Sequence, residues 1–321
     1  MIKKSMLRKL STLAILMAVA GSTFAADFPT RDIRYIVPWP AGGGVDGISR
    51  KINAIAEQQI DKSIFVENIG GAVTATGLLQ MSKARPDGHT IAALTYDSII
   101  TLPRGQMVPG YSLDNMRYIA RITKEADAIV VSKSSGISSY EELIEAARAA
   151  PGTIRIGVAP EGSGPYLAVQ RLQKATGVEF NVIAYPGSSS AETEALLSGE
   201  IVAAISSLGD FNGIIESGDV SGVIELSSEQ NPSYPDVPPI SEKGVDLETG
   251  SFIVLAAPAK TPDDVITSLE SLYKAAYETE EFQSWITKVG VTPSWLGAAD
   301  VQDWVDSLQT TTFGVMDELG L

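Results

Sequence analysis

Short apolar runs alternate with amphipathic stretches along most of the chain, and this alternation is the strongest constraint on its fold. Near the N-terminus, apolar runs at 33–37, 63–67 and 90–94 predict buried strands, and apolar residues at helical spacing predict helices over 46–60 and 74–84. Strands that alternate with helices form βαβ units, whose strands are parallel. We therefore predict an α/β fold with a mostly parallel sheet.

A second set of elements follows, and it has the same alternating pattern. Ser138 and Glu141 form a capping box that predicts the start of its first helix. The proline-rich segment 231–239 cannot be regular structure, because proline lacks the amide donor. The expected strands of this set are 128–131, 153–158, 180–184, 201–206, 222–226 and 252–256, and the expected helices between them include 165–175 and 191–197.

The last helices, expected at 262–279, 281–289 and 299–319, are accompanied only by a short strand at 291–293. This order indicates that the chain returns to the first unit near residue 250. We expect lobe 1 to comprise 26–129 and 250–321, and lobe 2, residues 130–249, to be inserted into it. Two segments that cross between lobes form a hinge, and ligands bind in the cleft between such lobes.

The first 25 residues have the pattern of a cleaved signal peptide. Lys3, Lys4, Arg8 and Lys9 form a positive region, an apolar stretch follows, and small residues precede a cleavage site after Ala25. The apolar run is too short for a membrane span. Cleavage removes four of the 24 basic residues and none of the 39 acidic ones, so the net charge changes from −15 to about −19. We expect a soluble periplasmic protein.

Composition excludes several classes of function. The chain has no cysteine and a single histidine, His89, so disulfides, thiol nucleophiles and multi-histidine metal sites are excluded. An acidic chain lacks the basic face that nucleic acids require. The Asp and Glu residues are scattered, and we interpret nearly all of them as solvated surface charges. We expect no metal and no cofactor.

Three glycine-rich loops each connect a predicted strand to a predicted helix, where ligands of α/β sheets bind. They lie at 38–46, 67–74 and 159–165. Glycine lets a ligand approach the backbone, and the following helix offers free amide donors and a positive dipole end. The loops therefore predict binding of an anion by local amides and hydroxyls. Trp39, in the first loop, is either a lid over the ligand or a packing residue.

Two other interpretations of these residues are weaker. Gly42, Gly44 and Gly47 match the dinucleotide fingerprint, with Glu67 as the ribose-binding acid, but prolines separate the glycines from the strand and export argues against the cofactor. A secreted hydrolase would have to use Ser163 and His89. Ser163 lies outside a Gly-x-Ser-x-Gly turn, and we expect His89 to be a half-exposed residue at a strand edge.

Several motifs, taken in order, resemble one family over nearly the whole mature chain. They are PTRDIRYIVPWPAGGGVD at 29–46, VEN at 66–68, ARPDGHT at 84–90, SYEEL at 139–143, YPG at 185–187, YPDVP at 234–238 and AAPAKTP at 256–262. The sequence resembles the substrate-binding proteins of tripartite tricarboxylate transporters, also called Bug receptors. The resemblance implies a two-lobed type II periplasmic binding protein without enzymatic activity. Such a protein captures a small carboxylate and presents it to a membrane permease of one large and one small subunit.

The resemblance also implies which residues grip a carboxylate through amides, hydroxyls and water. By position, these are Ala41, Gly42, Gly43 and Asp46 in the first loop, Gly71, Ala72 and Thr74 in the second, and Ser163, Gly164, Tyr185, Gly187 and Ser188 from the other lobe. To these we add Trp39, Tyr96, Asp97 and Ser206, which lie near the expected pocket.

The chain departs from the family pattern around this pocket, so the identity of its ligand cannot be inherited. The second loop lacks the usual Arg-Pro-Gly-Ala-Gly-Gly, Tyr185-Pro186-Gly187 lacks the usual lysine, and Asp97 follows the third strand. If Asp97 faces the pocket, it favours a ligand with an amine or hydroxyl. The expected ligand is a di- or tricarboxylate or an aromatic acid, bound by a monomer. The alternative is a carboxylate sensor for a two-component signalling system.

Overall fold

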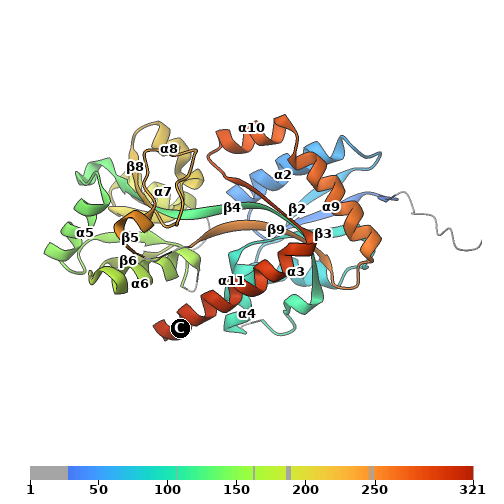
Figure 1. Ribbon diagram of the computed structural model, residues 1–321, viewed down its shortest axis with the longest axis horizontal. Helices are drawn as coiled ribbons and strands as arrows, with labels where there is room; N and C mark the ends of the chain where they lie inside the picture. Colours follow the sequence, from blue (N-terminus) through green and yellow to red (C-terminus); the bar gives the residue numbers. More distant parts are fainter. Residues whose placement is uncertain are drawn as a thin grey trace, which may run out of the picture.

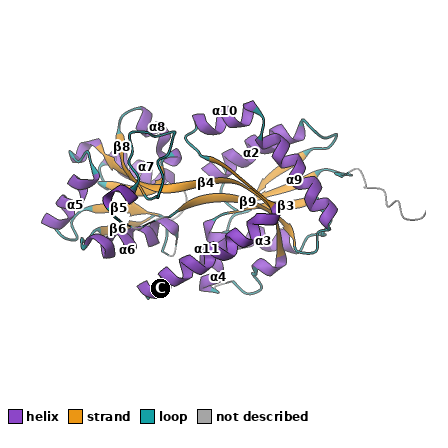
Figure 2. Cartoon of the chain, viewed as in Figure 1, coloured by secondary structure: helices purple, strands orange, loops and turns teal. Residues whose placement is uncertain are grey.

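The computed structural model describes residues 28–106, 108–161, 163–185, 189–245, 247 and 249–320. They form two α/β lobes that lie side by side along the long axis of the molecule (Figure 1). Strands β4 (Met116–Ser132) and β9 (Gly250–Pro258) pair antiparallel and run between the lobes (Figure 2). The predicted signal peptide lies outside the described residues.

The first lobe is built on three parallel strands, β2–β1–β3, followed by the antiparallel strands β9, β4 and β10. Side chains of β1 alternate between the two faces, as strand geometry requires. Tyr35 packs in a core with α2 (Gly44–Glu57), α9 (Asp263–Tyr277) and α10 (Glu280–Lys288). Its neighbour Ile36 packs in a second core with α3 (Ala75–Ser82) and α11 (Ala298–Leu319). The strands are Ile33–Val37 (β1), Ile64–Asn68 (β2), Thr90–Leu94 (β3) and Pro293–Gly297 (β10).

Helices cover both faces of this half of the sheet (Figure 2). They are α2 (Gly44–Glu57), α3 (Ala75–Ser82), α4 (Leu102–Gly105), α9 (Asp263–Tyr277), α10 (Glu280–Lys288) and α11 (Ala298–Leu319), with a π-helical turn η1 (Asp97–Thr101) and a 3-10 turn η2 (Leu113–Asn115). The end of α11 reaches the second lobe, where Glu318 lies 3.8 Å from Lys174.

The second lobe continues the sheet in the order β4–β7–β5–β6, with β8 also paired to β4. Its cores lie between the sheet and α5 and α6 on one face, and α7 on the other. The strands are Arg155–Val158 (β5), Asn181–Ala184 (β6), Ala203–Ser207 (β7) and Val220–Glu225 (β8). The helices are α5 (Tyr140–Ala149), α6 (Gly164–Thr176), α7 (Ser189–Ser198) and α8 (Asn212–Glu216), and the short 3-10 turns are η3 (Lys133–Ser135), η4 (Gly209–Phe211) and η5 (Ile240–Lys243).

The structure confirms the two-lobed α/β fold. It corrects the prediction of a mostly parallel sheet, because the centre of the sheet is antiparallel. The two central strands, β4 and β9, are antiparallel to their partners. The strand predicted at 128–131 is the end of β4, which is 17 residues long. Polar side chains at Lys124, Glu125 and Asp127 interrupt the apolar pattern because this part of β4 crosses the cleft. The lobe boundaries at 129/130 and 249/250 stay a prediction.

Two smaller predictions are also corrected. The cap of α5 is Ser139, whose hydroxyl accepts a hydrogen bond from the amide of Glu142, and not Ser138. Ser138 instead donates its amide to the Glu142 carboxylate at 2.7 Å, so the capping box is shifted by one residue. The last strand, expected at 291–293, lies at Pro293–Gly297.

Within the described part of the chain, no helix combines the length and apolarity needed to cross a membrane.

Close packing at the crossing strands predicts a large effect of one small substitution. Gly250 of β9 pairs with Ala126 of β4, and a methyl group at Gly250 would lie 1.9 Å from the carbonyl oxygen of Glu125. We expect Gly250→Ala to lower the free energy of unfolding by about 2 kcal/mol or more, because the backbone must move. Gly213→Ala is the control, since space around Gly213 is open. Equal denaturation midpoints for the two variants would contradict this expectation.

Candidate functional site

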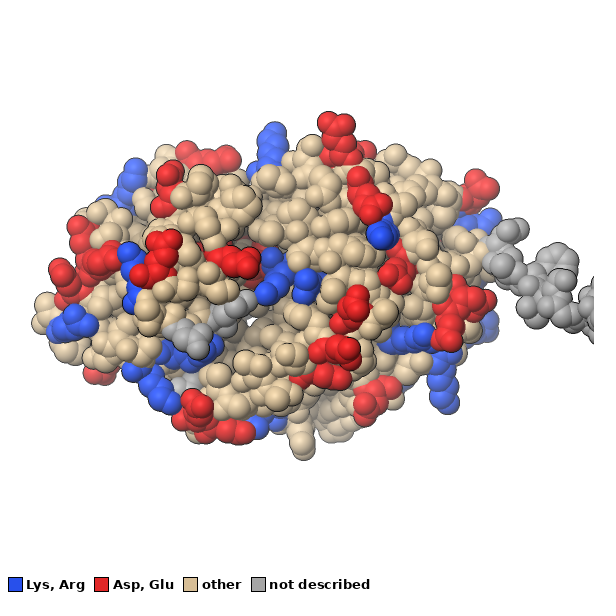
Figure 3. Space-filling view, in the orientation of Figure 1, with Lys and Arg blue, Asp and Glu red and all other residues tan. Residues whose placement is uncertain are grey.

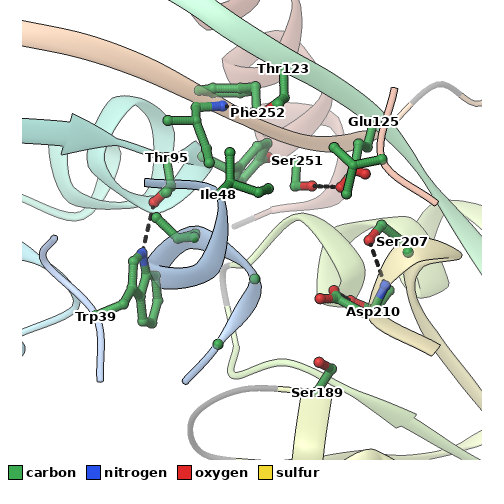
Figure 4. Close-up of a pocket in the computed structure, with 18 of the residues that line it drawn as sticks. Trp39, Ile48, Thr95, Thr123, Glu125, Ser189, Ser207, Asp210, Ser251 and Phe252 are labelled. Atoms are coloured by element: carbon green, nitrogen blue, oxygen red, sulfur yellow. Dashed lines mark hydrogen bonds between the residues drawn. The ribbon is translucent and has the colours of Figure 1, made fainter. Parts of the chain in front are cut away.

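A cavity of about 400 Å³ lies between the lobes, a volume suited to a small organic molecule. Its floor is formed by the crossing strands β4 and β9, one wall by the first glycine loop and α2, and the other by α6, α7 and η4 (Figure 4). Apolar side chains from the first lobe, including Trp39, Ile48 and Phe252, face polar and acidic side chains from the second.

The first glycine loop is fixed by one aspartate. Gly42 has φ +89°, which favours glycine, and its amide donates to Asp46 Oδ2 at 2.9 Å. Asn68 donates to Asp46 Oδ1 at 2.9 Å, and Arg50 lies 3.0 Å from the same carboxylate. Burial alone would raise the pKa of Asp46, but the hydrogen bonds from Arg50, Gly42 and Asn68 outweigh it and lower the pKa. Asp46 is therefore ionised, and its carboxylate holds the loop in this conformation.

The N-terminus of α2 points its first amides at the cavity. The helix begins at Gly44 after an extended Gly43, and no side chain caps it. The first amides of an α-helix have no partner within the helix, and together with the helix dipole they attract negative charge. Trp39 lies beside this end of the helix, and its indole nitrogen donates to Thr95 Oγ1 at 3.2 Å (Figure 4). Trp39 thus lines the cavity while it is held in place by the lobe.

The opposite wall and the floor carry carboxyl groups. Glu125 and Asp127 project from alternate positions of β4, Glu192 from the first turn of α7, and Asp210 from η4 after β7. Ser251 donates to Glu125 Oε2 at 3.3 Å, and Ser206 donates to Asp210 Oδ2 at 2.5 Å. Asp97 also lines the cavity and accepts a hydrogen bond from Thr101 at 2.8 Å.

This acidic group corrects the interpretation that nearly all Asp and Glu residues are surface charges. Burial, reinforced by the charge of Asp210, raises the pKa of Glu125 to about 8 and that of Glu192 to about 8. Burial also raises the pKa of Asp127 to about 7, and the pKa values of Asp97 and Asp210 are raised for the same reason. Figure 3 shows that other acidic side chains are indeed spread over the surface of both lobes.

The structure brings nine of the sixteen predicted site residues to the cavity: Trp39, Gly42, Gly43, Asp46, Tyr96, Asp97, Ser163, Gly164 and Ser206. Five others do not line it: Ala41, Gly71, Ala72, Thr74 and Tyr185. The remaining two, Gly187 and Ser188, lie outside the described residues. Contact of any of these residues with a ligand stays a prediction.

The second glycine loop has a strained backbone, and its residues are not among those that line the cavity. Gly71 and the three residues after it all have positive φ, and Thr74 Oγ1 lies 3.1 Å from Ser98 Oγ in the protein interior. Thr74 joins this loop to η1 through that contact, and a role of the loop in ligand binding stays a prediction. Tyr185 donates its hydroxyl to Glu200 at 2.9 Å and does not line the cavity.

The residues of the hydrolase interpretation are not assembled. Ser163 accepts the amide of Tyr166 and caps α6, whereas His89 does not line the cavity. His89 is 4 % exposed, so the expectation of a half-exposed position was wrong. Its ring contacts the N-terminal segment at Thr30 and its own turn at Asp87, which explains its burial.

Sequence comparison identifies the family. Residues 48–321 match the model of the tripartite tricarboxylate transporter family receptor. The chain belongs to this receptor family. The receptor is 26 % identical to the protein BugT of Bordetella pertussis over 295 residues, which cover 90 % of each chain. It is also 24 % identical to a Cupriavidus necator protein encoded in the gbd 5′ region, over 95 % of the receptor and 93 % of that protein.

Solved structures of periplasmic binding proteins share the fold of the receptor. A protein of R. palustris solved with adipate has a TM-score of 0.82 and 25 % identity, covering 92 % of the receptor and 99 % of that chain. The periplasmic binding protein BugD has a TM-score of 0.80 and 24 % identity, covering 91 % and 99 %. The Rhodopseudomonas palustris protein MatC, solved with malate, has a TM-score of 0.77 and 20 % identity, covering 90 % and 99 %. This family is one of solute receptors and not of enzymes.

Sequence reasoning missed Glu125, Asp127, Glu192 and Asp210. Glu125 and Asp127 are two positions apart, so they lie on one face of a strand. This alternation would have been visible if the predicted strand had begun before residue 128. Glu192 and Asp210 had no comparable signal, because the fold brings them to the cavity from separate segments.

Proposed function

We propose that the receptor captures a small organic acid in the periplasm and delivers it to the membrane subunits of a tripartite tricarboxylate-type transporter. The observation that carries this proposal is the cavity between the lobes, into which α2 points its uncapped N-terminus. The neighbours solved with adipate and malate support a carboxylate as the ligand class. The family and its structures give no support to the alternative of a sensor subunit.

The geometry fits capture better than catalysis. A receptor needs complementary donors and a closing cleft, and the cavity floor on two crossing strands is suited to lobe movement around them. We infer that the protein is exported with its first 25 residues removed and acts as a monomer that uses no cofactor. Its partners are then the ligand and the large and small permease subunits.

Thermal unfolding in the presence of organic acids tests this proposal. We expect at least one member of a panel of mono-, di- and tricarboxylates, aromatic acids and amino acids to raise the Tm. A ligand at 100 times its Kd stabilises the folded state by about 2.7 kcal/mol. Absence of a shift with every acid, at concentrations up to several millimolar, would contradict the proposed function. Sodium chloride at matched ionic strength is the control.

A further inference from the structure

On the acidic side of the cavity, two buried carboxylate oxygens have no hydrogen-bond partner among the described residues. Asp127 is 2 % exposed, and its Oδ2 has no hydrogen-bond partner. Glu125 Oε1 is likewise inaccessible and without a partner, although Ser251 donates to the other oxygen of the same group. Buried carboxylate oxygens are almost always hydrogen-bonded. The hydroxyls of Thr249 and Ser207 lie beside these carboxyl groups, and the two free oxygens can also accept donors from a bound molecule.

Both unsatisfied groups belong to one face of β4 that is turned to the cavity. Thr123, Glu125 and Asp127 occupy alternate positions of the strand, and all three line the cavity. In the view of Figure 4, Glu125 and Ser251 of the cavity floor lie next to each other at the top, and Asp210 of the wall lies below them. The charges of Asp127 and Asp210 both act on Glu125, so the carboxyl groups form one electrostatic cluster.

Among the described residues, the charges that act on Glu125, Asp127 and Glu192 are all negative. The described residues that line the cavity include no Lys, Arg or His. Arg121, earlier on β4, is directed to Ser294 and stacks 4.6 Å from the Trp304 ring. Among the described residues, no three metal-binding side chains converge to hold a metal ion. An organic cation would supply the complementary charge.

Two of the glycine loops predicted to attract an anion already face carboxylates of the protein. A methyl group at Gly44, the first residue of α2, would lie 3.3 Å from Asp210 Oδ1. A methyl group at Gly164, the first residue of α6, would lie 3.6 Å from Asp127 Oδ2. A ligand with two or three carboxylates would therefore bring further negative charge against these groups, at a cost in free energy that grows in a low-dielectric cleft.

We propose that the ligand of this receptor carries a protonated nitrogen with N–H groups that bind Asp127 and Glu125, in addition to a carboxylate. The proposal rests on the proposed function, which supplies the carboxylate for the amides at the start of α2. Hydrogen-bonding ammonium or guanidinium groups satisfy both free oxygens, which a quaternary ammonium could not do. Trp39, Ile48 and Phe252 form the apolar wall for the carbon body of such a zwitterion.

The direction of pH dependence separates this proposal from its main alternative, in which protonated carboxyl groups donate to a dicarboxylate. The titratable groups that line the cavity here are Glu125 and Asp127 on β4, Glu192 on α7, Asp210 on η4, and Tyr96 and Asp97 at η1. Two further groups interact with them electrostatically: Tyr234 with Glu125, and Arg171 on α6 with Tyr96. Between pH 6 and pH 8 the acids lose protons, so binding of an ammonium strengthens and binding of a dicarboxylate weakens.

Calorimetry with matched ligands tests the proposal. The probes are adipate, 6-aminohexanoate, hexanoate and 1,6-diaminohexane, with the corresponding four-carbon and five-carbon sets, and terephthalate with 4-(aminomethyl)benzoate. We expect an amino acid of at least one set to bind ten-fold or more tightly than its dicarboxylate, and its affinity to rise from pH 6 to pH 8. Asp127→Asn should remove this preference, whereas Glu194→Gln, on the exposed side of α7, should keep it.

The possible outcomes distinguish failure of the ammonium site from failure of the proposed function. Tighter binding of dicarboxylates in every set that binds would overturn the ammonium site and leave the proposed function standing. Binding of diamines without binding of any acid would support the ammonium site and overturn the carboxylate receptor. An amino-acid preference that survives in both Asp127→Asn and Glu125→Gln would overturn the assignment to these side chains, and absence of binding by all probes would count against both proposals.

Discussion

Replacement of Gly43 by phenylalanine is expected to weaken ligand binding at least 100-fold while the Tm of the unliganded receptor changes by no more than about 2 °C. A 100-fold loss corresponds to about 2.7 kcal/mol of binding free energy. Gly43 has φ −82° and ψ 173°, an extended conformation that any residue adopts, and no atom lies within 4 Å of an added Cβ. The first atom of the new side chain therefore meets open space.

The ring would occupy the space that the ligand needs. Gly43 lines the cavity and precedes the first amide of α2, so the phenyl group would cover the donors that are proposed to hold the carboxylate. Loss of glycine at this N-cap position costs only a fraction of a kcal/mol to about 1 kcal/mol, which explains the small change expected in Tm.

The matched control is Gly213→Phe. Gly213 lies in α8, has open space around it and does not line the cavity. Titration calorimetry with an acid identified by the thermal panel measures both variants. If Gly43→Phe binds as tightly as Gly213→Phe, the ligand does not use the N-terminus of α2. If Gly43→Phe unfolds at a much lower temperature, the loop has a structural role that the open space around Gly43 does not suggest.

The sequence predicted best those elements whose signal is local. Strands β1 and β3 begin and end at the predicted residues, because each is a short apolar run between polar segments. Strand β4 was predicted at a quarter of its length because its middle, around Glu125, passes through the cleft and carries polar side chains. A continuous apolar run marks a strand only where both of its faces are buried.

The same distinction explains which part of the site could be predicted. The first glycine loop has a conformational requirement at Gly42 that is visible in the sequence, and it does line the cavity. The glycines of the second loop carry a similar signal but serve a strained turn. Asp210 and Glu192 are two of 39 acidic residues, and only the fold distinguishes them from the others.

The unliganded receptor is expected to lose stability as the pH rises from about 5 to about 8.5. Burial raises the pKa of Asp127 to about 7 and that of Glu125 to about 8, whereas both groups titrate near 4 in the unfolded chain. Between these values the folded state binds more protons than the unfolded state, so the free energy of unfolding falls with increasing pH. The contribution of Asp127 and Glu125 to stability is fully present below about pH 4, where both groups are protonated in the folded and the unfolded chain.

The expected loss is large enough to measure. A shift of three pKa units corresponds to roughly 4 kcal/mol for one group, and we expect about half of this, which lowers the Tm by roughly 4 °C for a chain of this size. Asp46 acts in the opposite sense, because its lowered pKa gives stability that is lost only as the pH falls below its ordinary value. Differential scanning calorimetry from pH 5 to pH 8.5 measures the slope.

Asp127→Asn tests whether the cavity is the origin of this slope. The amide keeps the shape of the side chain but cannot ionise, so the variant should have a flatter profile than the wild type and be the more stable of the two at pH 8.5. Glu194→Gln, on the same lobe but exposed, should run parallel to the wild type. Parallel profiles for all three proteins would contradict the expectation. A ligand that carries an ammonium group should flatten the wild-type profile as well, because it replaces the protons as the partner of Asp127 and Glu125.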